Sequence, residues 1–140
     1  MKTKKILFVC KNNRFRSKVA EAYFKKTNKN KNVSSAGLFQ GFPMDKRTTK
    51  TAKGLGIDLK GKPRAMSNKL LTEQDIVIIV ADDVPEKVFI KRYCKKLIVW
   101  KIPDADKMTK KAIEKPIKLI IKRIDKLNKT LEKGKWKQIM

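Results

Sequence analysis

Cys10 and Arg16 are the residues of this chain whose types and spacing best suit chemistry, because they form the pattern C-x5-R, followed directly by Ser17. The apolar run Ile6–Val9 before Cys10 is typical of a buried strand, and Ser17 begins a segment with helical spacing. In a loop between a strand and a helix, backbone N–H groups and the positive end of the helix point at one place. The pattern therefore predicts a site that holds a phosphate dianion against the Cys10 sulfur.

Each residue of the pattern has a predicted part in this chemistry. The Arg16 guanidinium can bind two phosphate oxygens at once. Because positive groups favour the thiolate, which is the reactive form, Cys10 is the predicted nucleophile. The Ser17 hydroxyl could cap the helix and donate to the same sulfur. The alternative for Cys10 is structural, since free cysteines are often small buried residues.

Five blocks of the sequence, which follow one another along nearly the whole chain, resemble the low-molecular-weight protein tyrosine phosphatase family and its thioredoxin-coupled arsenate reductase relatives. The first and most specific block runs from residue 6 to 24, and the others are SAG at 35–37, GFPMDKR at 41–47, GID at 56–58 and IPD at 102–104. The resemblance implies one α/β domain over residues 1–140. It also implies a four-stranded parallel sheet of strand order 2-1-3-4, with helices on both faces.

The resemblance further implies a metal-independent phosphomonoester hydrolase without a cofactor. Cys10 would attack phosphorus in line and form a cysteinyl-phosphate, while Arg16 and the loop amides hold the phosphate oxygens. Asp104 matches the family's general acid, which protonates the leaving oxygen and later activates water. Asp104 could instead be an aspartate of a turn or a helix cap, and Asp106 could take either role. Ala105 stands where the family usually has proline after the acid.

The other residues near the pattern are expected to bind phosphate or to support the loop. Asn13 matches the family's loop asparagine, in keeping with the tolerance of asparagine for positive φ, and Asn12 stands where glycine is usual. Ser35 resembles the family serine that braces this asparagine, with an ordinary hydroxyl at a strand end as the alternative. Three further loop residues complete the predicted phosphate site, and a solvated role is the alternative for the two charged ones: Lys11, Arg14 and Phe15.

The substrate class follows from the residues less directly than the reaction does. A phosphorylated protein or a small phosphomonoester is the expected partner, and phosphotyrosine is the family's usual substrate. Family members that act on phosphotyrosine carry aromatic residues after the acid, whereas this chain has Ala105, Asp106 and Lys107 there. Leu38 and Phe39 are the candidate pocket walls, with a place in the core as the alternative for each.

Two other functions are compatible with the sequence. The first is arsenate reduction, since arsenate mimics phosphate, but the related reductases use two further closely spaced cysteines and only Cys94 is available here. The second is a catalytically weak protein that uses the anion loop and its basic surface to bind phosphoproteins or RNA.

The composition bounds the remaining possibilities. The chain has a formal net charge of +24 over 140 residues, and 31 of its 37 basic residues are lysines spread along every segment. Such a spread is more typical of a solvated surface than of base recognition, although nonspecific binding to polyanions at low salt should follow. The absence of histidine excludes a Cys-His pair and disfavours a metal site. With two cysteines and no long apolar run, the sequence predicts a cytoplasmic protein without a membrane span, and it indicates no particular oligomeric state.

Strands and helices are predicted to alternate along the chain, which favours a parallel α/β sheet. The predicted strands cover residues 5–9, 33–35, 75–80 and 97–100. The predicted helices cover residues 17–26, 45–55 and 85–93, and a long terminal helix carries an apolar stripe from Ile113 to Leu131, with Pro116 either kinking it or marking its start. Because Cys10 and Asp104 follow the first and fourth strands, both are expected at the carboxyl edge of the sheet.

Overall fold

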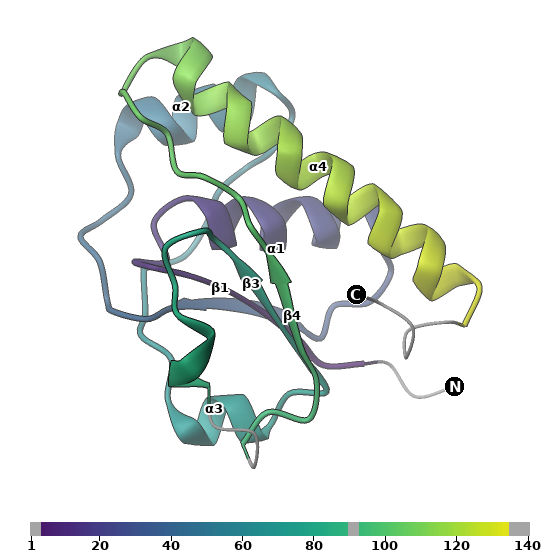
Figure 1. Ribbon diagram of the computed structural model, residues 1–140. Helices are drawn as coiled ribbons and strands as arrows, with labels where there is room; N and C mark the ends of the chain where they lie inside the picture. Colours follow the sequence, from purple (N-terminus) through teal and green to yellow (C-terminus); the bar gives the residue numbers. More distant parts are fainter. Residues whose placement is uncertain (1–3, 90–92, 135–140) are drawn as a thin grey trace.

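A parallel sheet of four strands forms the centre of the computed structural model, which describes residues 4–89 and 93–134. The strands are β1 (Ile6–Cys10), β2 (Val33–Gly37), β3 (Ile76–Val80) and β4 (Leu97–Trp100). They lie in the order β2-β1-β3-β4, which confirms the predicted topology (Figure 1). Every residue of β1 and β3 is buried, as expected for parallel strands that are covered on both faces.

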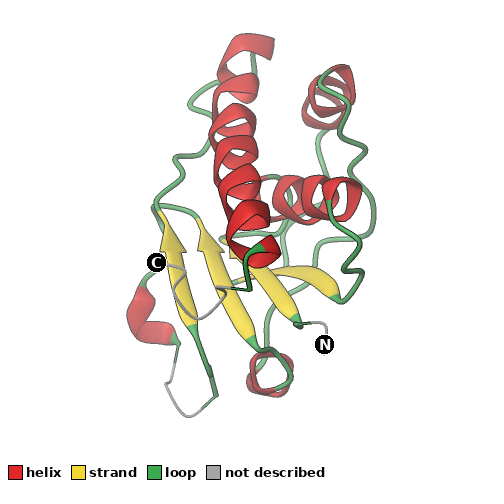
Figure 2. Cartoon of the chain, turned by 90° about the vertical axis from the view of Figure 1, so that its right-hand side faces the viewer, coloured by secondary structure: helices red, strands yellow, loops and turns green. Residues whose placement is uncertain are grey.

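Helices cover both faces of this sheet (Figures 1 and 2). On one face lie α1 (Arg16–Thr27), α2 (Lys46–Gly54) and α4 (Lys110–Glu132), and on the other lie α3 (Asn68–Thr72) and a 3₁₀ turn at Glu86–Val88. Successive residues of β1 point to opposite faces, so Ile6 and Phe8 pack with α1 and α4, whereas Leu7 and Val9 pack with Leu71 of α3. The two apolar layers hold β1, and hence Cys10 at its end, in a fixed place.

Helix α4 confirms the apolar stripe that its sequence predicts. The helix begins after Thr109, whose side chain accepts a hydrogen bond from the Ala112 N–H, and Pro116 lies inside the helix and does not mark its start. Residues three or four apart face the sheet and are buried: Ile113, Ile117, Ile120, Ile124 and Leu127. Among the residues that the structure describes, no helix is both long and apolar enough to span a membrane.

Two short segments differ from their predicted structure. The helix predicted for residues 85–93 is wrong over its first part, where only the 3₁₀ turn Glu86–Val88 forms, and residues 90–92 of that prediction lie outside the described residues. The backbone of Phe89 is extended and its ring is buried in the core, which ends the turn there. Helix α3 was not predicted, and it is nucleated by the Ser67 side chain, which accepts from the Leu70 N–H.

Tyr23 links α1 to α4 by donating its hydroxyl to Asp125 at 2.7 Å. Burial, the hydrogen bond to Asp125 and the charge of Asp125 raise the pKa of Tyr23 to about 12. Because the protonated phenol is the favoured form in the folded protein, its stabilising effect is complete below pH 10 and is lost as the pH rises from 10 through 12. The phenolate absorbance of Tyr23 is the difference between the titration curves of the wild type and of Tyr23→Phe. We expect this difference to titrate near pH 12, and a midpoint near pH 10 would contradict the hydrogen bond between Tyr23 and Asp125.

Candidate active site

The loop from Lys11 to Phe15 joins the end of β1 to the start of α1 and lies at the carboxyl edge of the sheet. Cys10 is the last residue of β1 and is only 2% exposed. Gly37, at the end of the neighbouring β2, pairs with Cys10, and a Cβ at this glycine would lie only 2.7 Å from the Asn13 nitrogen. The loop therefore packs so closely on β2 that no side chain fits at Gly37.

A buried hydrogen-bond network around Asn13 fixes the shape of this loop. Asn13 has a φ of 52° and is fully buried, and its amide group donates to Ser17 Oγ at 2.8 Å and to Ser35 Oγ at 2.9 Å. Its side-chain oxygen accepts from the Arg64 N–H at 3.0 Å. The Ser35 hydroxyl donates in turn to Glu21 Oε1 at 2.5 Å. The predicted positive φ is thus present at Asn13, whereas Asn12 does not adopt it.

This network also determines which way the Ser17 hydroxyl points its proton. Ser17 Oγ accepts from Asn13 and lies 3.0 Å from Cys10 Sγ. Since the Asn13 amide can only donate at this contact, the Ser17 proton is free to point at the sulfur. The predicted contact between Ser17 and the sulfur is present. The predicted helix cap is not, because α1 begins at Arg16 after Phe15, without a side-chain cap.

The backbone of the loop leaves its N–H groups available to an anion. The carbonyls of Cys10, Lys11 and Asn12 accept from the N–H groups of residues 38, 39 and 41. Within the described parts of the chain, in contrast, the N–H groups of residues 11–15 donate to no protein acceptor. Successive free N–H groups beside a helix start are a known arrangement for binding phosphate. The loop therefore has the donors that its sequence predicts.

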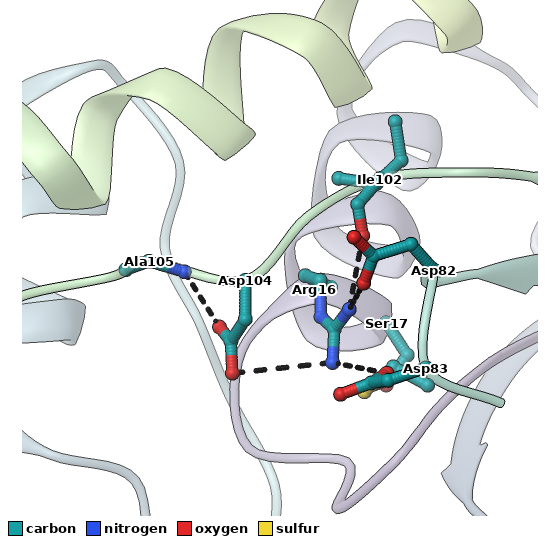
Figure 3. A network of polar contacts seen from close by, with 8 residues as sticks. Arg16, Ser17, Asp82, Asp83, Ile102, Asp104 and Ala105 are labelled. Carbon is teal, nitrogen blue, oxygen red and sulfur yellow. Dashed lines mark hydrogen bonds and ion pairs between the residues drawn. The ribbon is translucent and has the colours of Figure 1, made fainter.

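Arg16 is buried beside this loop and is held by three carboxylates (Figure 3). Its Nη2 donates to Asp83 Oδ1 at 2.9 Å, and its Nη1 donates to the Ile102 carbonyl at 2.9 Å. Asp82 lies 3.6 Å from Nη1, and Asp104 lies 3.9 Å from Nη2. A guanidinium has five N–H donors, so these contacts orient Arg16 and still leave donors for a phosphate.

Asp104 and Cys10 line the same cleft, which has a volume of about 250 Å³. The Asp104 side chain is 59% exposed, and its Oδ1 accepts from the Ala105 N–H at 2.9 Å, which fixes the carboxylate against its own loop (Figure 3). Asp106 is exposed and does not line the cleft. The remaining lining residues come from the loop, from the first residue of α1, from α2 and its N-cap, and from the segment before α4: Asn12, Arg14, Phe15, Arg16, Asp45, Thr48, Ala105 and Met108.

Some predicted site residues lie outside this cleft. Lys11 is exposed and is not a lining residue. Leu38 and Phe39, the candidate pocket walls, do not line it either, and Phe39 is 56% exposed. The apolar wall is formed instead by Phe15, Ala105 and Met108.

The sequence reasoning missed the acidic residues around the site. Asp82 and Asp83 follow β3 at the carboxyl edge, so the rule that placed Asp104 could also have found them. Asp45 is the first residue of the helix predicted for residues 45–55, and in the structure it caps α2, since it accepts from the Arg47 N–H at 2.8 Å. Its hydrogen bonds to Arg47 lower the pKa of Asp45, so this wall of the cleft carries a negative charge at neutral pH.

Replacing Asn13 by alanine should destabilise the fold by about 2–4 kcal/mol. The change removes three buried hydrogen bonds and leaves a residue with a side chain that disfavours positive φ. Chemical denaturation of the variant and the wild type measures the difference. Asn12→Ala is the matched control and should cost less than about 1 kcal/mol, and equal losses for the two variants would argue against the network.

Comparisons with known proteins agree with this geometry. Residues 5–137 match the family model described as low molecular weight phosphotyrosine protein phosphatase. A protein tyrosine phosphatase from Entamoeba histolytica, solved with Hepes in its active site, is 24% identical with a TM-score of 0.82, over 94% of this chain and 99% of that one. The tyrosine phosphatase Wzb from Escherichia coli K30, solved with sulphate, is 20% identical with a TM-score of 0.76, over 90% and 96%. An arsenate reductase from Archaeoglobus fulgidus is 26% identical with a TM-score of 0.72, over 88% and 98%. No curated protein sequence matches the chain significantly.

Proposed function

We propose, since the chain belongs to the low molecular weight phosphotyrosine protein phosphatase family, that it hydrolyses phosphomonoesters of phosphorylated proteins with Cys10 as nucleophile. Family membership makes the chain a cysteine-dependent phosphatase, and the substrate and the part of each residue are the proposal. The observation that carries it is the loop itself. Cys10 Sγ, the unpaired N–H groups of residues 11–15 and the buried Arg16 guanidinium all belong to one short segment beside the cleft.

The first chemical step is attack of the Cys10 thiolate on phosphorus. The Ser17 hydroxyl, 3.0 Å from the sulfur, stabilises the thiolate as a hydrogen-bond donor. The loop N–H groups and Arg16 hold the equatorial oxygens, on which charge develops in the transition state. The sulfur–phosphorus bond forms as the bond from phosphorus to the leaving oxygen breaks.

Asp104 then completes the reaction from the opposite wall of the cleft. A phenolic oxygen, with a reference pKa of about 10, leaves poorly as an anion at neutral pH. Asp104 gives this oxygen a proton and, once ionised, takes a proton from the water that attacks the cysteinyl-phosphate. That attack releases inorganic phosphate and restores the thiolate.

The walls of the cleft support an aromatic phosphate as substrate. Phe15 and Met108 offer an aromatic and a thioether surface beside Cys10, and both pack well against a phenyl ring. We therefore propose phosphotyrosine as the substrate class, bound between these two side chains. Phosphotyrosine peptides should be hydrolysed faster than phosphoserine peptides of the same sequence.

Hydrolysis of p-nitrophenyl phosphate by the wild type tests the proposal. We expect turnover in the presence of a metal chelator, with competitive inhibition by vanadate, which resembles the pentacovalent transition state. A folded protein without turnover would contradict the proposal and would favour the binding role. Dependence of the rate on added metal would contradict the metal-independent mechanism.

Arsenate reduction is a second candidate because a solved arsenate reductase shares the fold. The position of Cys94 argues against it. Leu97 of β4 is in register with Val77 of β3, and Val77 is in register with Leu7 of β1. Cys10 follows Leu7 and lies toward the carboxyl ends of the strands, whereas Cys94 precedes Leu97 and lies toward their amino ends. Three residues of β1 alone span about 10 Å, more than the roughly 7 Å that a disulfide allows between Cα atoms. Thioredoxin-dependent arsenate reduction through a Cys10–Cys94 disulfide would contradict this argument.

The basic surface and the cytoplasmic location stay predictions. The formal charge of +24 should give nonspecific binding to RNA at low salt, and that binding should weaken steeply as salt is added. Two free cysteines, Cys10 and Cys94, suit a reducing compartment.

A further inference from the structure

The outer face of α4 carries a row of lysines, on the side of the helix opposite to the buried stripe that packs on the sheet. Figure 1 shows α4 along the outer edge of the helical layer. At about 100° per residue, six lysines of this helix fall within an arc of about 80°, and all six are exposed. We call them the α4 lysine row: Lys111, Lys115, Lys118, Lys122, Lys126 and Lys129. At a rise of about 1.5 Å per residue, the row is about 27 Å long.

The ammonium groups of this row are exposed to water and are available to a charged partner. Elsewhere on the surface, Lys25, Lys60 and Lys95 form ion pairs with carboxylates. In the described part of the chain, by contrast, no lysine of the row forms an ion pair. Neighbouring lysines of the row are three or four residues apart, and like charges at this spacing destabilise a helix. A polyanion bound along the row would screen this repulsion.

The row is narrow, because acidic residues border it on one flank. Glu114, Asp125 and Glu132 follow one another at about two or three helical turns, which places them on the same flank of α4. Asp125 accepts from the Tyr23 hydroxyl at 2.7 Å, so this flank faces α1. The other flank carries one arginine, Arg123, among uncharged residues. The row is therefore a line about one lysine wide, which fits a linear polyanion better than a plane of charged groups.

The residues of α4 favour duplex DNA over other polyanions. Proteins that bind single strands stack the bases on aromatic side chains, and α4 has no aromatic residue. Helices that bind lipid surfaces insert several apolar side chains, whereas Leu119 is the one exposed large apolar residue among the described residues of α4. Duplex DNA carries about one charge per 1.7 Å of its axis, and an acidic peptide carries at most about one per 3.3 Å. Duplex DNA therefore best matches a row of closely spaced lysines.

We propose that the α4 lysine row binds the phosphate backbone of double-stranded DNA. At about 3.4 Å per base pair, the row covers about 8 base pairs. Contacts to phosphates carry no sequence information, so the binding is independent of the DNA sequence. The inference goes beyond the phosphatase reaction and does not depend on it, because no lysine of the row lines the cleft at Cys10. It also goes beyond the nonspecific binding that the net charge predicts, because it assigns the contact to one face of one helix.

Fluorescence anisotropy with a duplex of about 20 base pairs, measured over a range of salt concentrations, tests this site. The duplex has hydroxyl ends, so that it offers no phosphomonoester to the catalytic cleft. Each lysine that contacts a phosphate contributes about 0.9 to the slope of log K against log salt concentration. Replacing two central lysines of the row, Lys118→Gln with Lys122→Gln, should therefore reduce this slope by about 1.8.

Lys69→Gln with Lys87→Gln is the matched control. It removes the same charge from two exposed positions, in α3 and in the 3₁₀ turn, which lie over the other face of the sheet. We expect it to reduce the slope by less than about 0.5. Both double variants should hydrolyse p-nitrophenyl phosphate at the wild-type rate, which shows that they are folded.

Equal changes of slope in the two double variants would mean that the duplex contacts the whole basic surface, and they would overturn the proposal. Absence of binding by the wild type at low salt would also overturn it. Tighter binding to duplex RNA, to polyglutamate or to vesicles that contain phosphatidylserine, compared at equal concentrations of negative charge, would assign the row to another partner. ¹H–¹⁵N NMR of the wild type gives a reading that requires no variant. The DNA duplex should shift amide signals of residues 111–129 and leave those of residues 68–72 in place, and the reverse pattern would contradict the site.

Discussion

Replacing Cys10 by serine is expected to abolish turnover of p-nitrophenyl phosphate, with kcat reduced on the order of 10⁵-fold or more. The loop N–H groups, Arg16 and the Ser17 hydroxyl can donate to a thiolate, which is the reactive form of cysteine, whereas a serine hydroxyl is a much weaker nucleophile that needs a neighbouring base. The chain has no histidine that could deprotonate it. Steady-state kinetics on the purified variant, with the wild type assayed beside it, measures the loss.

The loss should be chemical, with the phosphate site intact. Serine is close to cysteine in size, and the variant should still bind inorganic phosphate, which ¹H–¹⁵N NMR would detect as shifted amide signals of loop residues 12–14. Residual turnover above about 1% of the wild-type rate would mean that another group attacks phosphorus, provided that the rate is proportional to the concentration of the variant and is inhibited by vanadate. Loss of phosphate binding together with turnover would mean that the substitution disrupts the loop, and the kinetic result would then say nothing of the nucleophile.

Three of the four strands, β1, β3 and β4, were predictable because local apolar runs determine them. Ile76–Val80 is continuously apolar and is buried over its whole length, and the stripe of α4 repeats at helical spacing over many residues. The segment near Phe89 was not predictable in the same way, since burial of one ring in the core ends a turn that the local sequence would allow to continue as a helix. Helix α3 is short, and its signal is little more than the cap at Ser67.

The part of the site that comes from one continuous segment, residues 10–17, was predictable from the sequence. The parts that depend on contacts between distant segments were less predictable. The family resemblance had already linked Asn13 with Ser35, whereas the contacts of this network with Ser17, Glu21 and Arg64 required coordinates. The cleft walls depend on how the segment before α4 approaches the loop, and this places Met108 beside Phe15. No pattern in the sequence predicts that these two distant segments come together. The prediction therefore placed Leu38 and Phe39 in the pocket wall, which Phe15, Ala105 and Met108 form instead.

Replacing Asp104 by asparagine should lower kcat/KM by a factor that depends on the leaving group. Phenyl phosphate releases a basic phenolate that needs a proton, and we expect a loss of about 10²- to 10⁴-fold. The nitrophenolate of p-nitrophenyl phosphate is far less basic and can leave as an anion, so its loss should be several-fold smaller. Because kcat/KM reports the step that releases the alcohol, later hydrolysis of the cysteinyl-phosphate does not obscure the comparison.

Asp106→Asn is the matched control, since this aspartate lies two residues further on, is exposed and does not line the cleft. Asp106→Asn should leave kcat/KM unchanged for both substrates. A loss equal to that of Asp104→Asn would indicate that Asp106 is the general acid. An Asp104→Asn loss of the same size for both substrates would also contradict proton donation. Asp104 lies 3.9 Å from the Arg16 guanidinium, so a uniform loss would indicate that Asp104 positions the arginine and that the leaving oxygen receives its proton from another source.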